Sequence, residues 1–175
     1  MKKSLISTFI AAACLSASGA AMAADNEAVQ NTTVTTTVTA VSGVTITLND
    51  TPQTVTTEEA KATGTLLTTL GIAATGLDLS SARGGNIAVE VDPSHFDVSS
   101  GSWLFKTADG NSNPLNARPQ AGNGWHHEPD NRVSYRLQNG DQNVNIQLPI
   151  QTNSGNTNVT AGNYTMPLTV SYNTW

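Results

Sequence analysis

Apolar residues alternate with polar ones over short segments that follow one another along this chain, and this pattern constrains the fold more than any other feature. Strict alternation places the apolar side chains on one face of a β-strand, whereas a helix requires a spacing of three to four residues. Segments of this kind span 44–48, 86–92, 132–138 and 143–151, and the longest spans 162–172. Segments 64–69 and 102–107 are also expected strands. We therefore predict an all-β fold.

The connections between these segments contain residues that favour turns. Asn49-Asp50-Thr51-Pro52 and Ala108-Asp109-Gly110-Asn111 are predicted turns. Segment 60–74 could instead be partly helical. Pro149 and Pro167 lie inside expected strands, which is tolerated at a sheet edge or a bulge because no ladder donor is needed there. Six or seven strands with short connections predict a β-sandwich of the immunoglobulin type.

The first 23 residues are predicted to be a secretory signal peptide. Lys2 and Lys3 precede an apolar stretch over 5–15, and Ala21-Met22-Ala23 is a small-x-small cleavage site. The alternative is a lipoprotein signal that uses Ala11-Ala12-Ala13-Cys14 as a poor lipobox. Cleavage after residue 23 predicts a mature chain that begins at residue 24 and a length suited to one modest domain.

The composition of the mature chain excludes several classes of protein. Without the two lysines of the signal, six basic residues face 13 acidic ones, a net charge of −7 that disfavours nucleic acid as a partner. Cys14 is the one cysteine of the sequence, so a mature chain without it has no disulfide. No later run approaches the roughly 20 apolar residues of a membrane helix.

The segment from Asp25 to Ala40 lies ahead of the first expected core strand. Its alternation predicts a strand with small side chains, and it is separated from Val44 by Val41-Ser42-Gly43. An ordinary first strand or a frayed terminus would have the same pattern. One face of this strand consists of Thr32, Val34, Thr36, Val38 and Ala40.

Both ends of the chain resemble subunits of chaperone-usher fimbriae, in particular the disulfide-free, capsule-like and atypical subunits assembled by chaperones with a long F–G loop. Ala161-Gly162-Asn163-Tyr164-Thr165 and the alternating residues after it are similar to the final strand of that family. The Thr/Val/Ala repeat that leads into 44–48 is similar to its donor strand and first core strand. The family often has an aromatic residue at the penultimate position. This chain has Thr174 at that position, with Tyr172 and Trp175 on either side.

The resemblance implies an incomplete immunoglobulin-like β-sandwich over 44–175, which lacks its seventh strand, and a donor-strand extension with its linker over 24–43. In that family a periplasmic chaperone lends a strand to the open groove, and at the outer-membrane usher the extension of another subunit replaces it. The expected partners are thus a fimbrial chaperone, an usher, further copies of the chain in a head-to-tail polymer, and a host-surface receptor. The implied acceptor groove runs beside Gly162, Tyr164, Met166, Leu168, Val170 and Tyr172.

The resemblance also implies where the extension can go. In the family's topology the missing strand runs parallel to the first core strand, and parallel neighbours need a crossover of roughly a dozen residues. Residues 41–43 are too few, so we expect the extension to enter a neighbouring subunit and to build a filament outside the cell, a fimbrium reached through the periplasm.

No other chemistry is expected. His126-His127-Glu128 is interpreted as an exposed loop, because adjacent side chains on a strand diverge and no third metal ligand has suitable spacing. No serine has a nucleophile-elbow pattern, so we predict neither catalytic residues nor a cofactor. Two alternatives remain: a monomeric carbohydrate-binding sandwich that uses exposed tryptophans among Trp103, Trp125 and Trp175, and a tip adhesin of the same fibres.

Overall fold

The protein is described by a computed structural model that covers residues 29–39, 43–80, 82–110, 113–129 and 131–175. The predicted signal peptide therefore lies outside the described residues. Strands dominate the fold, and helical structure is confined to α1 (Thr57–Lys61) and the 3-10 turn η1 (Pro93–His95) in this part of the chain. The strands are β1 (Val29–Thr39), β2 (Thr45–Pro52), β3 (Thr54–Thr56), β4 (Leu66–Thr75), β5 (Gly85–Val91), β6 (Phe96–Asp97), β7 (Ser102–Thr107), β8 (Leu115–Pro119), β9 (Trp125–His127), β10 (Arg132–Arg136), β11 (Asn143–Thr152) and β12 (Asn163–Thr174).

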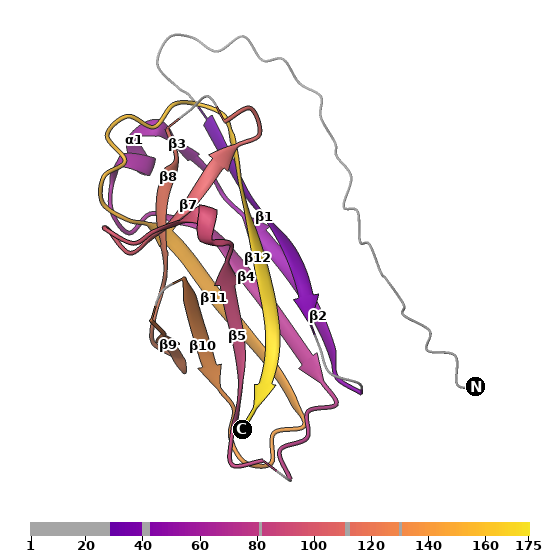
Figure 1. Ribbon diagram of the computed structural model, residues 1–175. Coiled ribbons are helices and arrows are strands. Elements are labelled where there is room, and N and C mark those ends of the chain that lie inside the picture. The colour runs from indigo at the N-terminus through magenta and orange to yellow at the C-terminus, as the bar shows by residue number, and fades with distance from the viewer. Residues whose placement is uncertain (1–28, 40–42, 81, 111–112, 130) are drawn as a thin grey trace, which may run out of the picture.

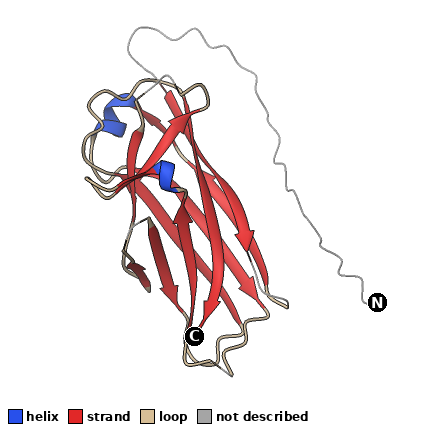
Figure 2. Ribbon diagram, viewed as in Figure 1, coloured by secondary structure: helices blue, strands red, loops and turns tan. Residues whose placement is uncertain are grey.

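The strands form two layers, as Figures 1 and 2 show. One layer has the order β1-β12-β5-β10-β9 and the other the order β2-β4-β11-β8-β7-β6. The two layers are joined by β7, whose end pairs with the start of β12 at Thr107 and Tyr164. The predicted all-β sandwich is confirmed.

The core lies between the layers and consists of the alternating apolar residues of both. Because successive side chains point to opposite faces of a strand, each long strand contributes every second residue. The contributors that are at most 2% exposed include Leu70, Ile72, Leu148 and Ile150 from one layer and Ile87, Val89, Met166, Leu168 and Val170 from the other.

Two predictions about the region around residues 49–69 were wrong or incomplete. Asn49-Asp50-Thr51-Pro52 is not a turn, because β2 continues through it and pairs with β4 as far as Pro52 and Thr68. The possible helix over 60–74 is limited to the end of α1, which a capping box of Thr56 and Glu59 starts. The remainder of that segment belongs mainly to β4, whose alternate residues are buried.

The two prolines occupy irregular places in their strands, but Pro167 does not lie at the predicted sheet edge, because β12 pairs with β1 on one side and with β5 and β7 on the other. Pro149 is next to the register shift between Ile150 and Gln151, where β11 departs from regular pairing with β4. Pro167 lies between the residues of β12 that pair with β7 and those that pair with β5. A missing backbone N–H is tolerated best where the ladder changes partner.

A close backbone approach fixes the end of β4 against the turn that precedes β2. A Cβ atom at Gly76 would lie 2.3 Å from the carbonyl oxygen of Gly43, and the φ angle of Gly76 is +75°. Both features require glycine at position 76. A residue with a Cβ atom is strained at positive φ, and the backbone of Gly43 cannot easily move away from such an atom. Gly140 has a φ of +98° but open space around its Cα.

We expect Gly76→Ala to lower the free energy of unfolding by more than Gly140→Ala. The control carries the positive-φ strain alone, about 1 kcal/mol, whereas Gly76→Ala adds the clash with Gly43. Urea unfolding of both variants measures the difference. Equal losses would show that the approach of Gly76 to Gly43 does not constrain the fold.

Candidate functional site at the β1–β12 pairing

The C-terminal strand β12 presents a continuous buried face to the core. Tyr164, Met166, Leu168, Val170 and Tyr172 are 0–6% exposed. Both tyrosines also anchor the strand at its ends, since the Tyr164 hydroxyl donates to the Thr160 carbonyl and the Tyr172 hydroxyl to the Asp78 carbonyl, each at 3.0 Å. The strand that the sequence identified as an acceptor is thus held rigidly in place.

Gly162, which was grouped with the acceptor residues, lies one position before β12 and is half-exposed. A Cβ at this position would be 3.5 Å from Thr107, an ordinary contact. Gly162 therefore belongs to the bend that leads into the strand, and the groove begins at Tyr164.

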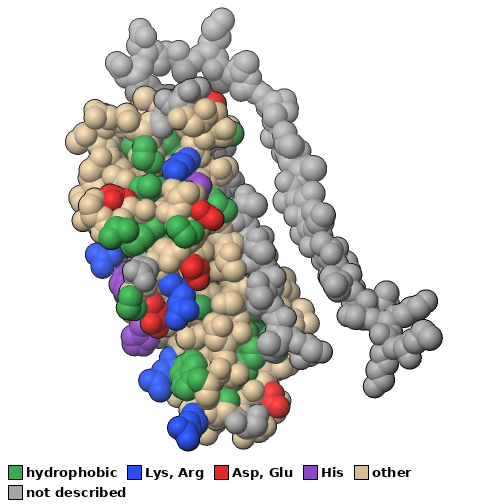
Figure 3. All heavy atoms as spheres, viewed as in Figure 1, with side chains coloured by type: hydrophobic (Ala, Val, Ile, Leu, Met, Phe, Trp, Pro, Cys, Tyr) green, Lys and Arg blue, Asp and Glu red, His purple; other side chains and the backbone are tan. Residues whose placement is uncertain are grey.

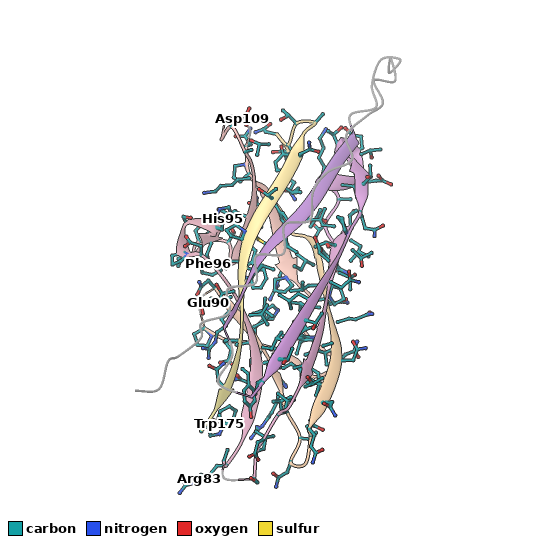
Figure 4. All side chains as sticks on the ribbon, turned by 90° about the vertical axis from the view of Figure 1, so that its right-hand side faces the viewer. Arg83, Glu90, His95, Phe96, Asp109 and Trp175 are labelled. Carbon is teal, nitrogen blue, oxygen red and sulfur yellow. The ribbon has the colours of Figure 1, made fainter. Side chains whose placement is uncertain are left out.

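The N-terminal strand β1 lies along β12 in parallel (Figure 4). The register pairs Thr32 with Tyr164, Val34 with Met166, Thr36 with Leu168 and Val38 with Val170, while Ala40 lies outside the described residues. Val34 is half-buried and packs against the core. The predicted donor strand and the predicted acceptor strand are therefore neighbours, but within one and the same chain.

The expectation that the linker is too short for the chain to fill its own groove was wrong, because β1 of the same chain lies beside β12 in the direction opposite to the one expected of a donor from a neighbour. β1 pairs antiparallel with β3, which continues β2 after Gln53, so β1 runs opposite to the first core strand. Antiparallel neighbours can be joined by a short connection, whereas parallel ones need a crossover. The few residues between Thr39 and Thr45 suffice in this orientation, so the chain can fill its own groove.

The second edge of β1 contacts β2 through a side chain instead of a strand ladder. The backbone N–H of Val34 donates to Oδ2 of Asp50 at 3.0 Å, and the buried Thr68 hydroxyl donates to the other carboxylate oxygen. Among the described residues, β2 pairs with β4, whereas β1 pairs with β12 and with three residues of β3. No ladder of backbone hydrogen bonds joins β1 to β2 in this part of the chain. The Asp50 carboxylate thus connects the edge of β1 to β2.

Burial raises the pKa of Asp50 above its ordinary value, and the hydrogen bonds from Thr68, Val34 and Thr51 oppose this shift without cancelling it. A carboxylate that loses water at a strand edge favours its neutral form. The stability that this group contributes is therefore fully present at pH values below its unfolded pKa and declines as the pH rises through the folded pKa.

Sequence reasoning missed Asp50 because the surrounding residues favour a turn. Aspartate beside asparagine and proline usually bonds to its own local backbone. Here its carboxylate has a local hydrogen bond from Thr51 and also contacts Val34 of β1 and Thr68 of β4, which are 16 and 18 positions away along the chain. No local signal in the sequence distinguishes these two uses of an aspartate.

The other residues that the sequence singled out do not form a site. His126 and His127 belong to β9 instead of a loop, although both are exposed. In the part of the chain that the structure describes, no group of three potential metal ligands is found, and no helix has the length and apolar character needed to cross a membrane. Trp103 and Trp125 are buried, and Trp175 is 54% exposed.

Comparison with known proteins gives one family. A family model described as "Dr-family adhesin" matches residues 24–175, which include the whole of both layers. No curated protein matches the chain.

We expect the stability of the wild-type protein, relative to Asp50→Asn, to fall as the pH rises through the raised pKa of Asp50. The native state holds this proton more tightly than the unfolded state, so raising the pH favours unfolding, and asparagine has no proton to lose. Urea unfolding of both proteins between pH 3.5 and 8, roughly in half-unit steps, measures the difference. Parallel pH profiles would show that Asp50 is not desolvated at this edge.

Proposed function

The chain belongs to the Dr-family adhesins, and from this membership we propose that it is a structural subunit of surface fibres, polymerises by donor-strand exchange and supports adhesion to a host surface. The family match supports the adhesive, cell-surface role. The pairing of β1 with β12 supports the exchange mechanism, because it identifies the strand that would leave one subunit and enter the next.

The observation that carries this proposal is the way β1 is held. It forms a parallel ladder with β12, and a side chain connects it to β2 where a second ladder would be expected. Parallel pairing is slightly weaker per residue than antiparallel pairing. A strand that enters from a neighbour in the opposite direction would pair antiparallel with β12 and would lie parallel to β2, so it can replace β1.

Exchange releases one β1 from its own subunit for each β1 that is inserted into a neighbour, so the net gain in free energy per subunit is small. Burying a valine fully is worth roughly 1.5–3 kcal/mol and a strand hydrogen bond about 1 kcal/mol, but ordering each residue costs about 1–2 kcal/mol. We infer that slow dissociation preserves the polymer once it forms. Because the donor and the groove are different surfaces, the contact is head-to-tail and continues as a filament.

Export and assembly follow the same scheme. Residues 1–23 direct the chain to the periplasm, a fimbrial chaperone keeps the groove occupied, and an outer-membrane usher catalyses its replacement by the strand of another subunit. The chaperone has to compete with β1 of the same chain, which has the advantage of a high effective concentration. Catalysis plays no part in this function, and no cofactor or metal is needed.

The two alternatives have less support. A monomeric carbohydrate-binding sandwich agrees with the closed single chain, but two of its three tryptophans, Trp103 and Trp125, are buried and cannot stack on sugars. A tip adhesin of the same fibres needs no donor strand, whereas β1 fits the groove over nine paired residues from Asn31 to Thr39.

We expect Val38→Asp to leave export intact and to abolish polymers. Val38 lies in register with the buried Val170, so a charge at this position opposes insertion into any groove. Thr37→Asp is the matched control, because its register partner Thr169 is exposed. Co-expression with a fimbrial chaperone and usher, followed by electron microscopy, measures fibre yield. Normal fibres from Val38→Asp would rule out β1 as the donor.

A disulfide tests whether β1 must leave its own subunit. Thr37→Cys and Thr169→Cys place two cysteines at a register pair, in a mature chain with no cysteine of its own. We expect oxidation to lock β1 on its own β12 and to stop fibre growth, and reduction before assembly to restore it. Gel electrophoresis without reductant and fibre yield are measured together. Fibres built from internally cross-linked subunits would exclude the exchange mechanism.

A further inference from the structure

Trp175 is an exposed aromatic residue that the fold holds in a fixed position. Its backbone N–H donates to the Gly84 carbonyl at 3.1 Å, and its carbonyl accepts from the Arg83 N–H at 2.6 Å. The indole lies on Gly84, where a Cβ atom would be 2.7 Å from Cζ2 of the ring. The chain end is thus tied back to the β4–β5 connection (Figure 4), and about half of the tryptophan still faces solvent.

A shallow hollow of about 280 Å³ lies beside this ring on the outer face of the β9–β10–β5–β12 layer. Asn86 of β5 and Ser134 of β10 form its buried polar floor. The Ser134 hydroxyl donates to Glu128 at 2.5 Å, and Asn86 accepts from Asn173 at 3.0 Å. Its polar rim consists of the exposed His126 and Arg136 and of the half-buried Glu128, whose carboxylate is the acceptor of the Ser134 hydroxyl.

The arginines near Trp175 have no acidic partner among the described residues. The ion pair found in that part of the chain is Lys61–Glu58, which lies on α1. Arg83 and Arg136 are both exposed on a chain whose net charge is −5. Figure 3 shows basic side chains and histidines on this side of the molecule, with acidic side chains between them. Two arginines without an ion pair in the described part of the chain thus lie near the exposed tryptophan, and the acidic residue that lines the hollow, Glu128, accepts a hydrogen bond from Ser134.

We propose that the surface formed by Trp175, Arg136, His126 and Asn86, the Trp175 face, docks a receptor protein through an acidic surface that also contains apolar side chains. This inference rests on the proposed adhesive function and assigns a place to the receptor contact. Arg136 pairs with a carboxylate of the receptor. Trp175 packs against the neighbouring apolar side chain.

The chemistry of this face favours a protein surface over a small ligand. Tryptophan and arginine are the residues most enriched in protein–protein hot spots. The hollow is smaller than most small-molecule pockets, which enclose about 300–1,000 Å³, and its open form suits a protruding side chain. Unpaired arginines also attract an acidic partner and orient its approach. An acidic sugar would offer the carboxylate without the apolar neighbour.

A peptide titration tests the face directly. The probe is a blocked octapeptide of alternating glutamate and leucine, with the matching glutamine–leucine peptide and sialyllactose as comparisons. The readout is the indole N–H signal of Trp175 in NMR spectra of the full chain, assigned with Trp175→Phe. We expect a saturable shift with the glutamate peptide and binding about tenfold weaker with the glutamine peptide.

Charge reversal identifies the arginine that carries the contact. We expect Arg136→Glu to weaken peptide binding about tenfold and Arg118→Glu, an exposed arginine of β8 in the other layer, to leave it unchanged. Both substitutions are exposed, so folding is not at risk. Equal binding by the two variants, equal binding of the two peptides, or a response to sialyllactose alone would each overturn the proposal.

Binding of assembled fibres to cultured epithelial cells separates this inference from the function on which it rests. We expect Trp175→Ala and Arg136→Glu fibres to bind at least about tenfold less than wild-type or Arg118→Glu fibres. Protease treatment of the cells should remove binding and sialidase should not. Fibres that bind equally well with either substitution would overturn the Trp175 face alone. Wild-type fibres that bind no cells would instead overturn the adhesive function, and the titration would still decide the face.

Discussion

The backbone pairing of β1 with β12 is the interaction on which the rest of this structure depends. β12 presents its buried face to the core and pairs with β5 and β7 along one edge, so β1 must occupy the other edge. Without a strand there, a row of backbone N–H and C=O groups would be unpaired beside Met166 and Leu168, which are almost fully buried. An edge of this kind attracts any available strand. The same property stabilises the single chain and is the basis of the proposed assembly.

The edge between β1 and β2 shows how the fold limits this pairing. The Asp50 carboxylate accepts a hydrogen bond from the Val34 amide. A continuous ladder of backbone hydrogen bonds between β1 and β2 would instead hold β1 along its whole length. A charged group at a strand edge costs desolvation, and burial accordingly raises the Asp50 pKa. The contact is therefore specific in position but modest in strength. We interpret it as a device that aligns β1 without making its release prohibitively slow.

The proposed receptor contact and the proposed assembly involve different parts of the sandwich. Assembly involves the β1–β12 edge, whereas the Trp175 face lies on the outer surface of the β9–β10–β5–β12 layer, around the far end of β12. Exchange of β1 leaves Gly84, Arg83 and Trp175 in contact, because their hydrogen bonds do not involve β1. In the proposed fibre each subunit presents its own copy of the face, and many weak contacts would add up by avidity.

Period-two alternation along the chain determined the strands and their buried faces, because a strand's side-chain geometry is local, whereas the pairing of the first and last segments was expected only from the family resemblance. Ser102–Thr107 was predicted with its observed bounds, and Asn143–Thr152 within one residue. The shortest strands, such as β9, contain too few residues for a pattern. Tertiary structure alone decided the direction of β1, the extension of β2 through Asn49–Pro52, and the partners of Asp50. These features depend on neighbours distant in the chain, whose hydrogen bonds outweigh the local preference for a turn.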